Sequence, residues 1–247
     1  LAVASKAAGF VALLILVFVG FQGRGDVYQW FFVLLSVLTM TVGNLIALRQ
    51  TNIVRMLAYS GIAQAGYMLA PLATPGSSTA ALTAVIVYLV VYAAMNLGAF
   101  AVVIAVARKT RSAEISSFGG LFEYAPGLAV TMTVFLFSLA GIPPLAGFWG
   151  KWYVFLAAVQ AGLFPLAIIG VLASVVGAFY YLRIIKLMWF DEPAGGVVPM
   201  AGTLKAVLGL SGAFVLFYIL FAGPVAQTAW IQDLVEILDH AESPEEL

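Results

Sequence analysis

The stretch Ser138-Leu-Ala-Gly-Ile-Pro-Pro-Leu-Ala-Gly-Phe-Trp-Gly-Lys151 lies inside a long apolar run, residues 127–160. Pro143 and Pro144 each lack a backbone N–H, and each ring clashes with the carbonyl four residues back. A regular helix cannot continue through this pair. The sequence therefore predicts a helix that breaks at Gly141–Pro144.

The same two prolines leave two backbone carbonyls, those of Leu139 and Ala140, without their helical N–H partners. Non-helical backbone at membrane depth persists only where protein or water covers it, and membrane transporters place ion sites at such discontinuous helices. Lys151 follows the first proline by eight residues. A lysine beside a double-proline break marks a candidate ion or proton site.

The composition requires a lipid environment, because 64% of the residues are hydrophobic, only 9% are charged, and the mean hydropathy is +1.09. No water-soluble surface can be built from this composition. A spanning helix needs about 20 apolar residues. We expect an all-α, polytopic membrane helix bundle with about seven transmembrane helices, at roughly 1–21, 28–48, 54–73, 79–107, 127–160, 164–188 and 203–223.

The chain has no cysteine and a single histidine, His240. Iron–sulfur clusters, thiolate metal sites and haem bound by two histidines therefore lack ligands. The formal net charge is zero, and topology accounts for the basic residues, which argues against nucleic-acid binding. We expect no cofactor, no metal and no nucleic-acid partner.

The basic residues in the expected loops fall unevenly on the two sides of the membrane. One side receives only Arg24. The other receives Arg49, Arg55, Arg108, Lys109, Arg111, Arg183, Lys186 and Lys205. Cytoplasmic loops carry the excess of positive charge, so this larger group is expected to face the cytoplasm and the C-terminus the periplasm.

Lys6 and Lys151 remain, and both lie within apolar segments. Lys151 lies about 15 Å deep, where an ionisable group costs about 2.5–3.5 kcal/mol. Burial disfavours the charged form of an amine, so such a group can release and regain a proton. The alternative is a lysine ion-paired for structure alone, yet every Asp and Glu falls in an expected loop or in the tail. We predict that both lysines transfer protons.

Three further stretches accompany the proline motif: Ser5-Lys-Ala-Ala-Gly-Phe10, Arg49-Gln-Thr-Asn-Ile-Val-Arg-Met-Leu-Ala-Tyr-Ser60 and Gly147-Phe-Trp-Gly-Lys-Trp-Tyr-Val-Phe155. Together they resemble subunit N of the bacterial proton-pumping NADH:quinone oxidoreductase, respiratory complex I. Members of this antiporter-like family have fourteen core helices, in which two five-helix units repeat in inverted orientation. The chain is similar to the C-terminal portion, helices 8 to 14.

The resemblance implies a division of the chain into four parts. Residues 1–21 would be the last helix of a mostly missing first repeat, and residues 28–188 the second five-helix unit. Residues 203–223 would form the final transmembrane helix, before an acidic C-terminal tail at 224–247. The chain opens on Leu1 inside an apolar segment, so we also expect it to be part of a longer protein.

The resemblance also implies residue roles. Lys151 would be the central lysine of broken helix 12, and Lys6 the connecting lysine of helix 8. Side chains expected to support the proton path, together with waters, are Tyr59, Gln64, Asn96 and Ser138. Relatives often have a histidine where this chain has Gln64, which hydrogen-bonds water but cannot titrate.

The implied function is movement of protons from cytoplasm to periplasm, driven by NADH:quinone electron transfer in other subunits. The chain would act in the inner membrane beside antiporter-like subunit M and small membrane subunits. Other possibilities are a subunit of a multisubunit cation/proton antiporter or membrane-bound hydrogenase, and a passive membrane scaffold. Sodium dependence would favour the antiporter, whereas the cost of an unpaired midplane lysine argues against a scaffold.

Overall fold

The computed structural model describes residues 3–21, 24–74, 79–196, 198 and 200–226. Within these ranges the chain is helical and contains no strand. The elements are α1 (Ala4–Ile15), the π-helical turn η1 (Leu16–Gly20), α2 (Gly25–Leu48), α3 (Ile53–Leu69), the 3₁₀ turn η2 (Ala70–Ala73), α4 (Thr79–Thr110), the 3₁₀ turn η3 (Ile115–Phe118), α5 (Leu121–Tyr124), α6 (Pro126–Ala140), α7 (Ala146–Gln160), α8 (Phe164–Phe190) and α9 (Gly202–Ala226).

In the described residues, each of the seven predicted apolar segments is helical apart from short turns and the break in 127–160, which confirms the all-α fold. Three helices in the described ranges are long and apolar enough to cross a membrane by themselves: α2, residues 80–110 of α4, and α8. At about 1.5 Å per residue, neither α6 nor α7 alone spans a core of about 30 Å, so the two together form the predicted broken helix. Most of the predicted acidic tail, residues 227–247, lies outside the described residues.

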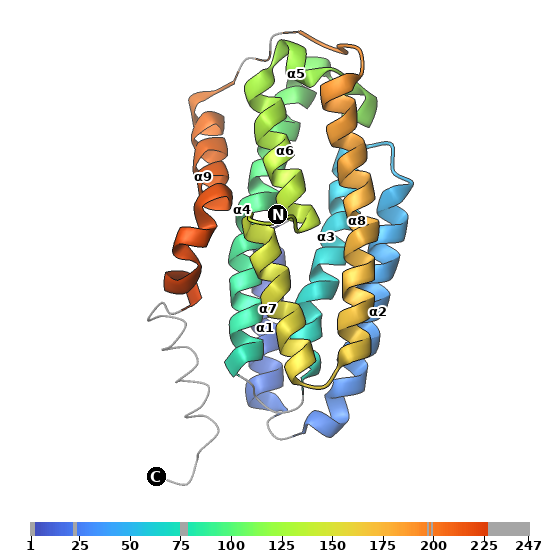
Figure 1. Ribbon diagram of the computed structural model, residues 1–247, viewed down its shortest axis with the longest axis vertical. Coiled ribbons are helices and arrows are strands. Elements are labelled where there is room, and N and C mark those ends of the chain that lie inside the picture. The colour runs from blue at the N-terminus through green and yellow to red at the C-terminus, as the bar shows by residue number, and fades with distance from the viewer. Residues whose placement is uncertain (1–2, 22–23, 75–78, 197, 199, 227–247) are drawn as a thin grey trace.

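The helices run along one long axis, with α6 and α7 following one another end to end beside α8 (Figure 1). Backbone hydrogen bonds join the loops at one end of the bundle. The Ile115 N–H donates to the Thr51 carbonyl at 2.7 Å, and the Gly120 N–H donates to the Leu187 carbonyl at 3.1 Å. This joins the α2–α3 turn, the end of α4 and the end of α8. The helix ends that carry most of the predicted basic group therefore lie together.

The outer surface of the bundle is apolar, as a lipid-facing surface requires. Trp30 on α2 is 71% exposed and Phe179 on α8 is 67% exposed. Inside, α2 and α3 pack with their backbones in contact, because a Cβ on Gly66 would lie only 2.5 Å from the Met40 backbone nitrogen. Such small-residue packing is typical of membrane helices. Polar side chains are therefore concentrated between helices, where they can meet.

Candidate functional site

The break between α6 and α7 occurs where the prolines predict it. Gly141 adopts a left-handed conformation with φ of 89°, and the Ile142 N–H donates to the Phe137 carbonyl at 3.0 Å. This is the closing hydrogen bond of a Schellman motif, a common helix end. The new helix begins at Ala146, so the predicted interruption at Gly141–Pro144 is confirmed.

Side chains bind the two carbonyls that the prolines free. Gln64 donates from Nε2 to the Leu139 carbonyl at 3.1 Å. The Ala140 carbonyl accepts from Lys151 Nζ at 2.8 Å and from Ser174 Oγ at 3.3 Å. The C-terminus of a helix carries partial negative charge, which favours an ammonium group there. The end of α6 therefore stabilises the lysine in its charged form without a carboxylate.

Lys151, on α7, is 6% exposed and makes contact only with neutral groups. Besides the Ala140 carbonyl, its Nζ donates to Ser174 Oγ at 2.5 Å and lies 5.0 Å from the centre of the Tyr67 ring. In the described part of the chain, the one salt bridge joins Arg24 and Asp26 on the surface. No described carboxylate pairs with the buried amine.

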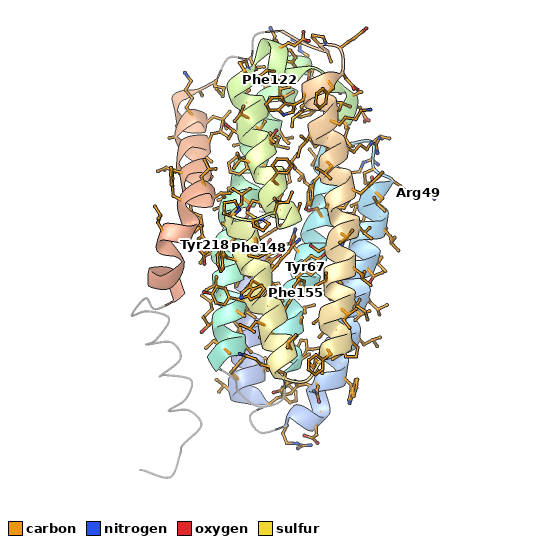
Figure 2. The ribbon with its side chains drawn as sticks, viewed as in Figure 1. Arg49, Tyr67, Phe122, Phe148, Phe155 and Tyr218 are labelled. Carbon is orange, nitrogen blue, oxygen red and sulfur yellow. The ribbon has the colours of Figure 1, made fainter. Side chains whose placement is uncertain are left out.

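A half-open pocket of about 390 Å³ between α7 and α8 reaches the amine. It is lined by Ala140, Gly141, Phe148, Lys151, Trp152, Phe155, Val171, Ser174, Val175 and Ala178. Figure 2 places Phe148 and Phe155 about half-way along the bundle. The walls are mostly apolar, and the polar groups are concentrated around Lys151.

Gln64, on α3, is the centre of a buried hydrogen-bond network. Its Oε1 accepts from the Tyr88 hydroxyl of α4, and its Nε2 also donates to the Tyr181 hydroxyl of α8 at 3.3 Å. The Tyr181 hydroxyl in turn pairs with Ser60. Through the Leu139 carbonyl, the same amide reaches the end of α6. One side chain thus joins four helices beside the break.

Lys6, on α1, is partly buried and has a tyrosine partner. Its Nζ donates to the Tyr92 hydroxyl at 3.2 Å and lies 5.2 Å from the centre of that ring. Gly61 of α3 makes room for this pair, since a Cβ there would collide with Lys6 Nζ and lie 2.7 Å from the Tyr92 hydroxyl oxygen. Tyr92 follows Tyr88 by one helical turn on α4. Polar groups therefore extend from Lys6 to the network around Gln64.

The structure brings some of the other predicted path residues close to this network. Asn96 is buried one turn beyond Tyr92, and its Nδ2 has no partner among the described residues. Ser138 is buried at the break, where its Oγ accepts from the Gly147 N–H at 2.9 Å and fastens α6 to α7. Tyr59 is only partly buried and makes no side-chain hydrogen bond to the described network.

The chain is similar to known proteins. Residues 1–177 match the family described as NADH:quinone oxidoreductase/Mrp antiporter, TM. The chain belongs to this transmembrane family. Its members include proteins from bacteria that are similar over nearly the whole of this chain.

Two curated relatives show the degree of similarity. NADH-quinone oxidoreductase subunit N of Parvibaculum lavamentivorans is 46% identical over 224 residues, which is 90% of this chain and 46% of the relative. Subunit N 1 of Rhizobium meliloti is 46% identical over 226 residues, 91% of this chain and 47% of the relative. The predicted resemblance to subunit N is confirmed, and the chain spans about half the length of these relatives.

Solved structures share the fold. A chain of respiratory complex I from Thermus thermophilus with bound Aureothin has a TM-score of 0.66 at 33% identity, over 79% of this chain and 44% of that one. A chain of an archaeal membrane-bound sulfane sulfur reductase has a TM-score of 0.78 at 27% identity, over 88% of this chain and 44% of that one. A chain of the Mrp complex from Dietzia has a TM-score of 0.72 over 86% of this chain and 50% of that one. Its identity is 23%, so this likeness shows the fold alone.

Several network residues in this family member were not identified from the sequence. They are Asn44, Ser60, Tyr67, Tyr88, Tyr92, Ser174 and Tyr181. Their spacing carried a signal, since Ser60, Gln64 and Tyr67 recur at helical intervals on one face of α3. A search for polar residues repeating along one face of an apolar helix would have marked this face of α3, but not its partners on the other helices. In the described residues, no group of three or more His, Cys, Asp and Glu could hold a metal ion.

Proposed function

We propose that this chain is the C-terminal part of a proton-translocating subunit, subunit N of respiratory complex I. Lys151 and Lys6 release and take up protons as these cross the membrane. One observation supports this proposal most strongly. The Lys151 amine is buried at a helix break, and its partners among the described residues are neutral. An intramembrane amine of this kind is costly unless it has a function.

The proposed path follows the polar groups between the two lysines. Tyr92, Tyr88 and Gln64 lead from Lys6 to the end of α6, where the Ala140 carbonyl holds Lys151. Waters complete the path, because Gln64 cannot titrate. Three further side chains, Tyr59, Asn96 and Ser138, support it by hydrogen bonding to these waters. Charge on one lysine disfavours charge on the other, which couples the two sites electrostatically.

The proposed orientation in the membrane rests on the basic residues, and the proposed neighbouring subunits rest on the family. The basic helix ends face the cytoplasm of a bacterial cell, and the C-terminus faces the periplasm. This chain has no redox chemistry of its own: NADH oxidation and quinone reduction occur in other subunits of the enzyme. Its neighbours are antiporter-like subunit M and small membrane subunits. Residues 28–188 form the second five-helix unit, after the last helix of the first.

A sodium test separates this proposal from an antiporter function, which the family description raises because it includes the Mrp antiporter. The full-length protein should be assayed in its assembled oxidoreductase, reconstituted in proteoliposomes. We expect NADH-driven acidification of the lumen at the same rate with and without sodium, since the site offers an amine and no described carboxylate for a metal cation. Acidification that requires sodium would favour the antiporter.

Gly61→Ala tests the proposed role of Lys6. The added Cβ would collide with Lys6 Nζ and move the amine from the Tyr92 hydroxyl. This should lower the pumping rate several-fold, since one lost hydrogen bond costs about 0.5–1.5 kcal/mol. Gly9→Ala is the matched control on α1, because a Cβ at Gly9 meets nothing within 4 Å. Equal pumping rates in these two variants would argue against Lys6 as a path residue.

A further inference from the structure

The buried amine of Lys151 lies over a tyrosine ring. Lys151 Nζ, from α7, is 5.0 Å from the centre of the Tyr67 ring of α3. Lys6 is held differently, because its Nζ lies 3.2 Å from the Tyr92 hydroxyl oxygen and 5.2 Å from the centre of that ring, which places it beside the hydroxyl. We propose that the Tyr67 ring is a positioning residue that replaces a counter-ion and stabilises the Lys151 ammonium group.

The physical basis is the charge distribution of the aromatic ring. The face of the ring is electrically negative and attracts a cation within about 6 Å of its centre, more strongly where water is excluded. A carboxylate at the same place would hold the ammonium permanently charged. A neutral ring lowers the cost of burying the ammonium and still allows the proton to leave. This inference rests on the proposed function, since it explains how a proton-transferring lysine is stabilised and can still release its proton.

The Tyr67 ring is fixed in the orientation that this role requires. The side chain is 1% exposed, and its hydroxyl accepts from Asn44 Nδ2 at 3.0 Å. Asn44 is itself anchored, because Nδ2 also donates to the Ala173 carbonyl at 3.0 Å. Phe155 packs against the Tyr67 ring edge to face, with centres 6.0 Å apart (Figure 2). The ring cannot turn away from Lys151 without breaking these contacts.

The other titratable groups beside the two amines are also tyrosines. The ring of Tyr88 lies against Gly150, the neighbour of Lys151 on α7. Tyr92 is the hydrogen-bond partner of Lys6, through its hydroxyl. No described acid or base faces either amine from the packed helices, so a ring variant changes the surroundings of its lysine without altering an ion pair.

The test replaces Tyr67 by phenylalanine and by trifluorinated phenylalanine in the full-length subunit of the assembled oxidoreductase. Both substitutes fill the same space, but fluorine withdraws the negative charge from the ring face. Tyr67→Phe should keep the wild-type pH dependence of proton pumping. The trifluorinated ring should move that dependence by about one pH unit to lower pH, because the less stable ammonium is lost sooner as pH rises.

Trifluorinated phenylalanine at position 122 is the control. Phe122 stacks on Trp189 far from either lysine, near the upper end of the bundle in Figure 2, and its substitution should shift nothing. Identical pH dependence for the two ring forms at position 67 would overturn the inference. If Lys151→Ala still abolishes pumping in that case, the proposed function stands and only the role of the ring is wrong. If Lys151→Ala pumps normally, the proposed function itself fails.

Discussion

Lys151→Ala should reduce the rate of NADH-driven proton pumping about a hundredfold or more, the lower range for loss of a positioned acid–base group. The substitution removes the amine that the end of α6 holds. The freed Ala140 carbonyl keeps Ser174 as a donor at 3.3 Å, so the helix break should survive and the complex should assemble. Acidification of proteoliposomes, followed with a pH-sensitive dye after addition of NADH, measures the effect.

Two further lysine variants separate the effect of losing proton transfer at Lys151 from the effect of losing a positive charge. Lys151→Arg keeps a positive charge and hydrogen-bond donors, but a guanidinium does not release its proton, so pumping should stay low. Lys205→Ala makes the same change as Lys151→Ala at an exposed position on α9 and should pump normally. Normal pumping by Lys151→Arg would show that charge alone suffices, which fits a structural scaffold better than a proton carrier.

Gln64→Leu should have the second-largest effect. Leucine would deprive the Leu139 carbonyl and the hydroxyls of Tyr88 and Tyr181 of their shared partner. Each polar group left unsatisfied in the interior costs about 1–3 kcal/mol. We expect a lower melting temperature in detergent and a several-fold slower pumping rate, because the link between the α4 tyrosines and the end of α6 is cut.

Gln64→His and Gln50→Leu serve as the comparisons. Histidine can still donate and accept at position 64, so Gln64→His should retain most of the pumping rate. The Gln50 side chain donates to the Ile46 carbonyl at an exposed helix end, and replacing it should leave both stability and pumping unchanged. Wild-type behaviour of Gln64→Leu would mean that protons do not follow this network.

The helix break and its consequences could be predicted because proline chemistry is local. Pro143 and Pro144 determine where the helix ends and which carbonyls lose their partners, whatever surrounds them. The depth of Lys151 likewise follows from counting residues along an apolar span. These features need no knowledge of the neighbouring helices.

The partners of those groups could not be predicted, because they depend on how each helix is rotated against the others. Nothing local to Ser174 indicates that it faces Lys151, and a tyrosine in an apolar helix, such as Tyr88, reads as another core aromatic. Ser138 has a contact that its position in the sequence does not indicate. Its polarity beside the break predicts a path residue, and in the structure its Oγ also accepts from the Gly147 N–H of α7.

The helix break connects the two parts of the proposed proton path. A double proline ends α6, and the carbonyls that this frees bind Gln64 from one side and Lys151 from the other. The same break therefore supplies an acceptor for the transfer amine and a contact to the tyrosines that lead to Lys6. The amine is stabilised by a helix end and an aromatic ring, neither of which is a base that would hold it permanently charged.

The number of protons pumped per NADH oxidised, compared between wild type and Lys151→Ala in the same proteoliposomes, tests this account most directly. Electron transfer and acidification are recorded together, so a slower enzyme is not mistaken for an uncoupled one. The account predicts a smaller ratio in the variant, with Lys205→Ala unchanged. An unaltered ratio in Lys151→Ala would contradict the assignment of this amine to the proton path.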